Sequence, residues 1–429
     1  MPETRIYVDL TTAFEERHRI PHGTTRVERK LVEAIAGLGR GDISFCRFDP
    51  RTHRFVALSP HDVKAAITTV AVADPRRAVR ASTRSHPLVA PFHRMEVWFR
   101  TNIRDPMRRT RREAIQKVTA SPDIFEPGSV LLLPGELQRH DFSHLMTLRR
   151  RLNLQLAFVF YDLLDTLSND DPRASDRNAV NIPGSEFVIR EASLILPISN
   201  HSGNQLRKHA STRGVTLPPV QTIRLGHQIA GAAPVENVAG LTPREIVLTV
   251  GDVTGRKNHR LLVEIWATLM RERGTPPIPL VVAGRIDIDG LPLVEASKTD
   301  PATTIAVKFL SEIDDAQLNW LYRNCRFTLF PSFSEGFGLP VVESLAYGKP
   351  CIASNAAAIP EASQGIAIHL DPHDMPAWRQ TIETLLDDDQ ALTRATADIA
   401  DHFRLVSWSD TANDALSAIA QMLQSRHAA

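Results

Sequence analysis

Residues 326–354 read RFTLFPSFSEGFGLPVVESLAYGKPCIAS. An apolar run of strand length opens this stretch, a loop with two glycines follows it, and a segment of helical period begins at Pro340. Gly348 ends that helix, and a second apolar run, PCIAS, comes directly afterwards. A strand, a helix and a further strand in this order predict a parallel sheet with helices on its faces.

The same alternation runs through both halves of the chain. Near-continuous apolar runs indicate buried strands: RIYVDL, SVLLLPG, LQLAFVFYD and SLILPIS in the first half, and EIVLTVG, PLVVAGR, TIAVKFL, RFTLFPS, PCIAS and AIHLDP in the second. Helical periodicity lies between them, over Thr25–Ala36, Ser202–His209, His259–Arg271, Asp314–Asn324, Pro340–Tyr347 and Met375–Leu386. The sequence therefore predicts an α/β protein with two doubly wound, Rossmann-like domains.

Composition suggests where these domains begin and end. The 429 residues are enough for two or three domains, and 43% hydrophobic with 23% charged residues excludes collagen-like, low-complexity and wholly disordered chains. A stretch rich in Gly, Ala and Pro, residues 226–243, is the predicted linker. We expect an N-terminal domain over 1–225, a second domain over 244–408 and a C-terminal helix over 409–429.

Charge is distributed unevenly along the chain. The net charge is +1, yet residues 1–150 hold 26 basic against 17 acidic side chains, and residues 301–429 hold 8 against 16. Residues 76–117 form a basic segment, with 12 Lys and Arg against three acidic residues around Trp98 and Phe99. Such a segment suits the surface of an anionic membrane, and a solvated insertion is the alternative. Nucleic-acid binding is disfavoured, because RNP-like and zinc-finger spacings are missing.

Cysteine content and hydropathy bear on the compartment. Cys46, Cys325 and Cys351 are scattered, which argues against a disulfide framework or a structural zinc site. The chain opens with a strand-like run where a signal peptide would be apolar, and no uncharged apolar stretch reaches about 18 residues. We expect a cytoplasmic protein, with peripheral contact at the inner face of the membrane through the basic segment.

The loop within the opening stretch carries features of an anion site. Gly336 and Gly338 lack Cβ atoms, so their backbone amides can approach a phosphate closely. Pro340 suits the first turn of a helix, whose N-terminal end favours negative charge. Glu335 and Glu343 flank this loop, and a carboxylate can accept two hydroxyl donors from a vicinal diol. The pattern predicts phosphates held between two sugar contacts; a plain strand–turn–helix with surface glutamates is the alternative.

A pair of cations lies upstream, in the sequence VGDVTGRKNH. Arg256 and Lys257 follow another predicted strand of the same domain on a loop that contains glycine. Two adjacent cations can neutralise a diphosphate leaving group without a metal ion. Adjacent Arg and Lys are also common on protein surfaces, so the functional interpretation of this pair depends on the glutamate loop predicted in the same domain.

Taken together, these residues resemble a known family. SEGFGLPVVESLAYGKPCIAS with VGDVTGRKN and DDAQLNWLYRNC is similar to the retaining glycosyltransferases of GT-B fold in the glycosyltransferase 4 family. The likeness runs through most of residues 244–410, and it is looser in IYVDLTT, HGTTRVERKL, FVFYDLL and ILPISNHSGNQL. Bacterial mannosyl- and rhamnosyltransferases of surface polysaccharide synthesis carry similar stretches. The resemblance implies two Rossmann-like domains that face a cleft, with the last helix returning to the N-terminal domain.

The resemblance also implies roles for individual residues. It assigns Arg256 and Lys257 to the donor diphosphate, Glu335 to the donor sugar, Glu343 to the ribose, and the backbone of Gly336, Phe337 and Gly338 to the phosphates and sugar. The implied co-substrate is a nucleotide sugar, with no cofactor and no metal. Retention of anomeric configuration rests on the same likeness.

The N-terminal half offers candidates for the other side of the cleft. Gly23 and Arg26 lie where the chain passes from the first predicted strand into the next helix. A flexible loop at this place can reach the donor across the cleft, although Gly23 also suits a plain helix start. Asp162 follows a predicted strand and is a candidate for orienting an acceptor hydroxyl, with a helix N-cap as the alternative. Related sequences often have His where this chain has Tyr161, which puts a His-based acceptor role in doubt.

Four further polar positions have structural explanations. His140 follows a strand end, but a lone His is more often structural. Ser199 is expected to cap its helix. Asp287 and Asp289 spell DxD, a metal–nucleotide motif of another glycosyltransferase fold, yet they lie in a strand-to-helix loop where Asp is ordinary turn chemistry.

The sequence thus predicts a retaining, metal-independent glycosyltransferase. Its donor is a nucleotide sugar, mannose being slightly favoured, and its acceptor is a saccharide or a lipid-diphosphate-linked saccharide. Two alternatives stay open: a non-catalytic subunit that binds a nucleotide sugar, and a nucleotide-sugar epimerase of GT-B fold. An NAD-dependent oxidoreductase is disfavoured, because no GxGxxG follows a predicted strand.

Overall fold

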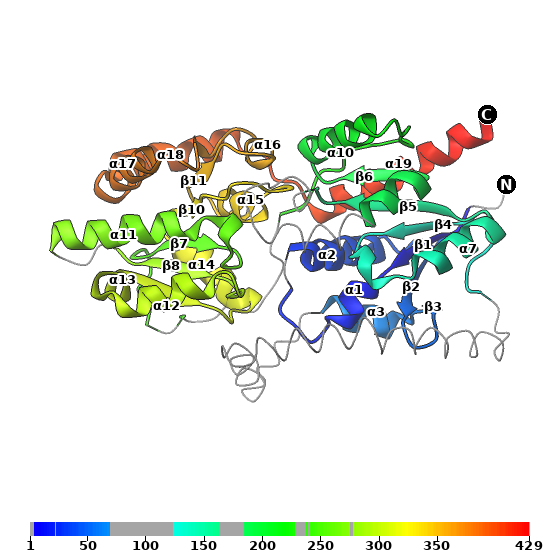
Figure 1. Ribbon diagram of the computed structural model, residues 1–429, viewed down its shortest axis with the longest axis horizontal. Helices are drawn as coiled ribbons and strands as arrows, with labels where there is room; N and C mark the ends of the chain where they lie inside the picture. The colour runs from blue at the N-terminus through cyan, green and yellow to red at the C-terminus, as the bar shows by residue number, and fades with distance from the viewer. Residues whose placement is uncertain are drawn as a thin grey trace.

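The computed structural model describes residues 4–21, 23–68, 123–163, 184–227, 237–238, 240–274 and 278–428. Two α/β domains lie side by side along the longest axis (Figure 1). The predicted basic segment, residues 76–117, lies outside the described residues, as do 228–236 and 239 of the predicted linker.

The N-terminal domain is built on a six-stranded sheet of order β3-β2-β1-β4-β5-β6. Its strands are β1 Ile6–Asp9, β2 Ile43–Asp49, β3 Arg54–Ala57, β4 Val130–Leu133, β5 Gln155–Phe160 and β6 Leu194–Pro197. Its helices include α1 Thr11–Glu15, α2 Gly23–Gly37, α3 Pro60–Ile67, α7 Phe142–Leu152 and α10 Asn200–Thr212, with a 3₁₀ turn at Leu137–Arg139. The strands pair in parallel except β3, which is antiparallel to β2.

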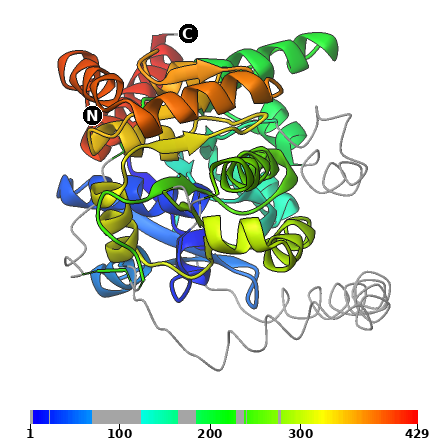
Figure 2. The same cartoon turned by 90° about the vertical axis from the view of Figure 1, so that its left-hand side faces the viewer.

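The C-terminal domain repeats the plan with the order β12-β11-β10-β7-β8-β9. Its strands are β7 Val247–Val250, β8 Leu280–Ala283, β9 Val307–Leu310, β10 Thr328–Phe330, β11 Cys351–Ser354 and β12 Ile368–Leu370. Its helices are α11 His259–Arg273, α12 Leu291–Thr299, α13 Pro301–Ala306, α14 Asp315–Asn324, α15 Leu339–Ala346, α16 Ile359–Ala362, α17 Met375–Asp387 and α18 Asp389–His402, with a 3₁₀ turn at Gly255–Lys257. Figure 2 turns this domain to the viewer, with α17 and α18 (orange) on one side and α12 and α13 (yellow-green) on the other.

Burial explains why the central strands are apolar along their whole length. Every residue of β4, β5 and β6 is buried, because helices cover both faces of the sheet. Leu132 packs on the face that carries α2, α3 and the last helix, whereas Leu131 packs on the opposite face with α7 and α10. Successive side chains of a strand therefore pack into two different cores, one on each side of the sheet.

The last helix, α19 (Trp408–Ala428), packs against the N-terminal domain. It contacts α2 and β6, and Ala412, Ala415 and Ile419 are buried in the core that those elements share (Figure 1, red). The chain crosses between the domains close to Gly226, where an added Cβ would lie 2.6 Å from the backbone nitrogen of Trp408. The predicted fold class, two doubly wound domains with a returning last helix, is confirmed.

Some elements differ from the expectation. The run TIAVKFL is only partly a strand: its first residues belong to α13, which Asp300 caps by accepting from the amide of Ala302, and β9 begins at Val307. Apolar residues alone do not separate a buried helix end from a strand. Strands β2 and β3 were not among the predicted strands. Among the helices of the described residues, none combines the length and apolar character needed to cross a bilayer.

Candidate functional site

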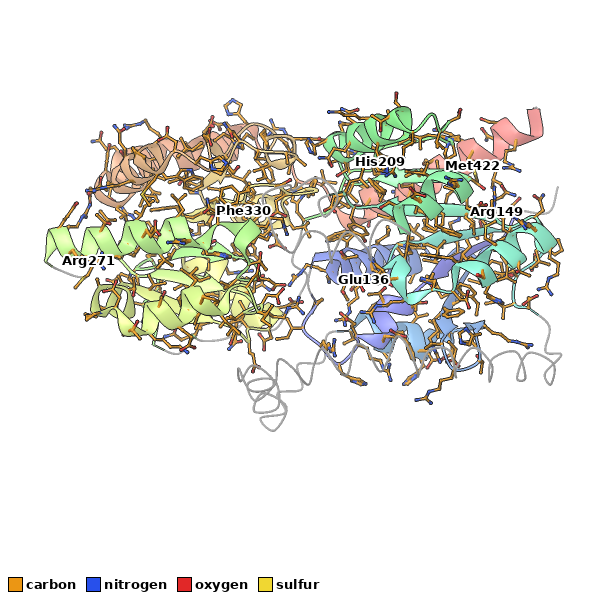
Figure 3. All side chains as sticks on the ribbon, in the orientation of Figure 1. Glu136, Arg149, His209, Arg271, Phe330 and Met422 are labelled. Atoms are coloured by element: carbon orange, nitrogen blue, oxygen red, sulfur yellow. The ribbon has the colours of Figure 1, made fainter. Side chains whose placement is uncertain are left out.

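The loop between β10 and α15 brings three predicted site residues together. Glu335 Oε1 lies 2.8 Å from a guanidinium nitrogen of Arg256 and 2.7 Å from Nζ of Lys257. The two loops are also joined through their backbones, because the amide of Phe333 donates to the carbonyl of Arg256 at 3.0 Å. Figure 3 labels Phe330, the last residue of β10, on the side of the C-terminal domain that faces the N-terminal domain. The ion cluster therefore sits at the carboxyl end of β10.

This cluster keeps its carboxylate charged although it is buried. Burial would raise the pKa of Glu335, but the charges of Lys257 and Arg256 outweigh burial and lower that pKa to about 2. Burial lowers the pKa of Lys257, and Glu335 acts in the opposite direction. Lys257 Nζ also lies 4.8 Å from the ring centre of Phe330. Two cations against one carboxylate leave an excess positive charge, which suits an anionic ligand.

Gly336 is required by a contact between the domains. A Cβ on Gly336 would lie 2.6 Å from the carbonyl oxygen of Tyr161 and 2.7 Å from Oδ2 of Asp162. The Gly336 carbonyl accepts hydrogen bonds from the hydroxyls of Ser199, at 2.7 Å, and Ser202, at 3.2 Å. The predicted donor loop is thus docked on the carboxyl ends of β5 and β6, and the predicted acceptor residue Asp162 lies directly against it.

The rest of the loop leads into α15. Gly338 precedes the helix with φ of 111°, a backbone conformation that favours glycine. Phe337 packs against the hydrophobic cores of both domains. The amides predicted to face phosphates therefore belong to a loop whose side chain at Phe337 is anchored on both sides.

Glu343 lies in α15 and is also buried. The Tyr322 hydroxyl donates to its Oε2 at 2.8 Å, and Nη1 of Arg26 lies 4.0 Å from its Oε1. Burial raises the pKa of Glu343, while the charge of Arg26 and the Tyr322 hydrogen bond lower it. Arg26 also pairs with Asp315 at 2.9 Å. Arg26 thus crosses from α2 to the C-terminal domain, and the exposed Gly23 is the first residue of α2.

Sequence reasoning missed other contacts across this interface. Ser199 caps α10, as predicted, by accepting from the amide of Ser202. The amides of Asn200 and His201 donate to the carboxylate of Glu361 in α16, at 2.7 and 3.1 Å. Neither Glu361 nor the Ser202 contact with Gly336 has a local sequence signal, because the partners are more than 130 residues apart.

The N-terminal side of the interface has a different character. His140 Nε2 lies 3.1 Å from Oδ2 of Asp9, and both side chains are buried. Glu28 of α2 is wholly buried nearby, where burial and then the charge of Asp9 raise its pKa well above the usual range. A Cβ at Gly135 would lie 2.9 Å from the Glu28 carboxyl group, so the chain after β4 packs tightly on it. Tyr161, the residue that replaces a family His, donates its hydroxyl to the carbonyl of Pro134.

The DxD sequence forms turn contacts in the structure. Asp289 Oδ2 accepts from the amide of Gly255 at 3.0 Å, and Asp287 Oδ1 accepts from the amide of Ile288 at 2.7 Å. Within the parts of the chain that the structure describes, no group of three or more His, Cys, Asp or Glu side chains is arranged to hold a metal ion.

Sequence comparisons find a family match in the C-terminal part of the chain and similar proteins of known activity. Residues 237–400 match the family described as glycosyl transferases group 1. The serotype-specific mannosyltransferase WbdA of Escherichia coli is 29% identical over 187 residues, 43% of this chain and 22% of that protein. The O-antigen chain mannosyltransferase B of the same species is 28% identical over 234 residues, 53% of this chain and 60% of that protein. The chain thus aligns with less than two thirds of either relative.

Structural comparisons extend over the whole chain. Sucrose-phosphate synthase from Thermosynechococcus elongatus superposes with a TM-score of 0.60 at 18% identity, with full coverage of both chains. Anabaena HepE, solved in complex with UDP and glucose, superposes with a TM-score of 0.57 at 15% identity, again with full coverage. At such identities these matches concern the fold. The chain therefore has the GT-B fold, and residues 237–400 of it match the glycosyl transferases group 1 family.

Proposed function

We propose that this protein is a glycosyltransferase that moves a sugar from a nucleotide-sugar donor to a saccharide acceptor. The observation that carries the proposal is the pair of cations, Arg256 and Lys257, held on the buried carboxylate of Glu335 at the domain interface. An excess of positive charge at the carboxyl end of a parallel strand suits a diphosphate. The group 1 domain match covers this region.

In this proposal the cations stabilise the leaving group. As the bond between the sugar and the diphosphate breaks, negative charge grows on the diphosphate, and Arg256 and Lys257 lie fixed beside it without the need to reorganise. Glu335 holds both cations and accepts from a donor sugar hydroxyl. Glu343 accepts from the ribose, and the loop of Gly336, Phe337 and Gly338 presents its backbone to the phosphates and sugar.

The acceptor enters from the N-terminal domain. Asp162 lies against Gly336, so its carboxylate is close to the donor loop and can orient an acceptor hydroxyl. We propose that this hydroxyl attacks the anomeric carbon from the face that the diphosphate leaves and gives its proton to the departing diphosphate oxygen, so the anomeric configuration is retained. We also propose that the reaction needs no metal ion, because Arg256 and Lys257 supply the neutralising charge.

The similarity to mannosyltransferases narrows the substrates. WbdA and O-antigen chain mannosyltransferase B are named for mannose transfer, which favours GDP-mannose as the donor here. We propose a polysaccharide or a lipid-diphosphate-linked saccharide as the acceptor, used at the cytoplasmic face of the membrane. The basic segment, with 12 Lys and Arg over residues 76–117, is the proposed membrane contact, and co-sedimentation with anionic liposomes at low and high salt tests it.

A two-stage assay tests the function. The full chain is first titrated with GDP, UDP, dTDP and ADP in thermal-shift measurements, and one nucleotide is expected to raise the melting temperature more than the others. Sugar nucleotides of that base are then offered with saccharide acceptors, and the anomeric configuration of the product is read by NMR. Binding of the nucleotide sugar without turnover would favour a non-catalytic subunit. Conversion of the donor into an epimeric nucleotide sugar when no acceptor is added would favour an epimerase. Activity that EDTA abolishes and Mn²⁺ restores would contradict metal independence.

A further inference from the structure

Arg26 of α2 contacts two carboxylates of the opposite domain. Its Nη2 donates to Oδ1 of Asp315 at 2.9 Å, and its Nη1 lies 4.0 Å from Oε1 of Glu343. The Arg26 side chain is 13% exposed and that of Glu343 is 6% exposed. Within the described residues Nη1 is buried and makes no hydrogen bond, and the carboxylates of Asp315 and Glu343 face the charge of Arg26.

The charge of Arg26 favours the ionised form of Glu343, which burial disfavours. Burial raises the pKa of a carboxyl group, because the charged form loses its hydration. Asp315 adds like-charge repulsion, whereas Arg26 and the Tyr322 hydroxyl act in the opposite direction. Tyr322 belongs to α14 of the same domain as Glu343, but Arg26 belongs to the other domain. Among the residues that the structure describes, the positive charge that faces Glu343 therefore comes from the other domain, through the contact between the two domains.

We propose that Arg26 is a positioning residue for the donor nucleotide: it holds Glu343 ionised and oriented, so that the ribose-binding end of the donor site is complete only when the domains are closed. This inference rests on the proposed function, in which Glu343 binds the ribose.

Hydrogen-bond capacity gives the physical reason. An ionised carboxylate only accepts, with about four lone-pair positions on its two oxygens. Tyr322 occupies one position on Oε2, which leaves room for both hydroxyls of a vicinal diol. A protonated Glu343 carries a hydrogen on one oxygen and loses acceptor capacity and charge. Arg26 thus acts on the ribose through Glu343.

The test compares a ribonucleotide with an analogue that lacks the hydroxyls. Affinities of the full chain for GDP or UDP, whichever gives the larger thermal shift, are measured by calorimetry beside those for the 2′,3′-dideoxy counterpart. Arg26→Gln is expected to weaken binding of the ribonucleotide about tenfold, a difference of about 1.4 kcal/mol, and to change binding of the dideoxynucleotide by less than about twofold. Glu343→Gln is expected to reduce the preference for the ribonucleotide as well.

A pH profile separates this role from a merely structural one. Without Arg26 the pKa of Glu343 rises further, so the carboxyl group is protonated over a wider range below neutrality. The affinity of Arg26→Gln for the ribonucleotide is therefore expected to fall as the pH is lowered from about 8 to about 6, more steeply than that of the wild type. Arg26→Lys keeps the positive charge and should restore the wild-type profile. Asp315→Asn removes the other partner of Arg26 and should leave the preference for the ribonucleotide intact.

Each contrary result has one meaning. If Glu343→Gln reduces the preference for the ribonucleotide but Arg26→Gln does not, the inference about Arg26 is wrong and the role of Glu343 stands. An equal loss of both nucleotides in Arg26→Gln, with a flat pH profile, would also overturn the inference. If Glu343→Gln leaves the preference unchanged, the proposed ribose contact itself is wrong.

Discussion

Glu335 and Glu28 are both buried glutamates, and their pKa values are shifted in opposite directions. Glu335 of the C-terminal domain lies between Arg256 and Lys257, and its pKa is about 2. Glu28 of the N-terminal domain has Asp9 among its neighbours, and its pKa is raised well above the usual range. Burial opposes ionisation at both sites, so the neighbouring charges decide the outcome.

This difference fits a division of labour between the domains. The C-terminal side concentrates positive charge around an ionised carboxylate, as a site for a diphosphate requires. On the N-terminal side, burial and the charge of Asp9 favour the neutral form of Glu28, and His140 Nε2 lies 3.1 Å from Oδ2 of Asp9. Such a surface fits the proposed acceptor side, where the ligand is a neutral hydroxyl.

Removal of a cation from the C-terminal side should have the largest effect. Lys257→Met keeps an apolar stem of similar length but removes the charge that is proposed to face the diphosphate. Loss of one preorganised stabilising group typically costs about 10²–10³ in rate, and we expect donor turnover to fall by that factor. Rates are measured together with melting temperatures, and Lys298→Met, an exposed lysine of α12, is the matched control. A rate within about threefold of the wild type would remove Lys257 from the site.

The contact between the two regions should be sensitive to a single methyl group. Gly336→Ala places a Cβ 2.6 Å from the Tyr161 carbonyl oxygen, and neither backbone can yield without a shift of the domains. Overpacking of this kind costs about 1–3 kcal/mol, and we expect transfer to fall about 5- to 150-fold. Gly37→Ala, where nothing lies within 4 Å of the added Cβ, should leave activity unchanged. Equal activities of the two variants would show that the close contact has no part in transfer.

Acid should destabilise the wild type through Glu335. Because its folded pKa is about 2, below the usual 4.5, its ion pairs stabilise the fold above about pH 4.5 and are lost as the pH falls toward about 2. The shift corresponds to about 3 kcal/mol of unfolding free energy as an order of magnitude. Urea unfolding is measured near neutral pH and near pH 3. The free energy of unfolding of the wild type should fall strongly between these pH values, and that of Glu335→Gln should fall less. A parallel loss in both proteins would argue against this assignment.

Glu28 should give a smaller effect of opposite sign. Its folded pKa is raised, so its contribution to stability is full below the unfolded pKa and is lost as the pH rises through the folded pKa. Glu28→Gln cannot ionise and should therefore gain in stability relative to the wild type as the pH is raised from about 4 to about 8. Urea midpoints across this range measure the difference. If Glu28→Gln instead became less stable relative to the wild type as the pH is raised, Glu28 would be ionised in the folded protein.

Much of the donor side could be predicted from local sequence. The spacing of Glu335 and Glu343 around a glycine loop, and the pair Arg256–Lys257 after another strand, point to the same edge of one sheet. The structure does bring Glu335 to both cations. The reason for Gly336 was less accessible: the sequence predicted an approach to phosphate, whereas the structure gives Gly336 a close contact with Tyr161 of the other domain.

Periodicity, turn residues and local spacing were therefore sufficient for the alternation of strands and helices, because this alternation depends on neighbours along the chain. The returning last helix was implied by the family resemblance, and the anion-binding character of the glycine loop stays a prediction. The tertiary structure alone decided that Arg26 meets Asp315, 289 residues away, that Ser202 and Glu361 join the domains, and that the pKa of Glu28 is raised. Electrostatic energies depend on distance through space and on exclusion of water. Neither the distance between two charges nor the exclusion of water around them can be read from the order of residues, because both are set by how the chain packs in three dimensions.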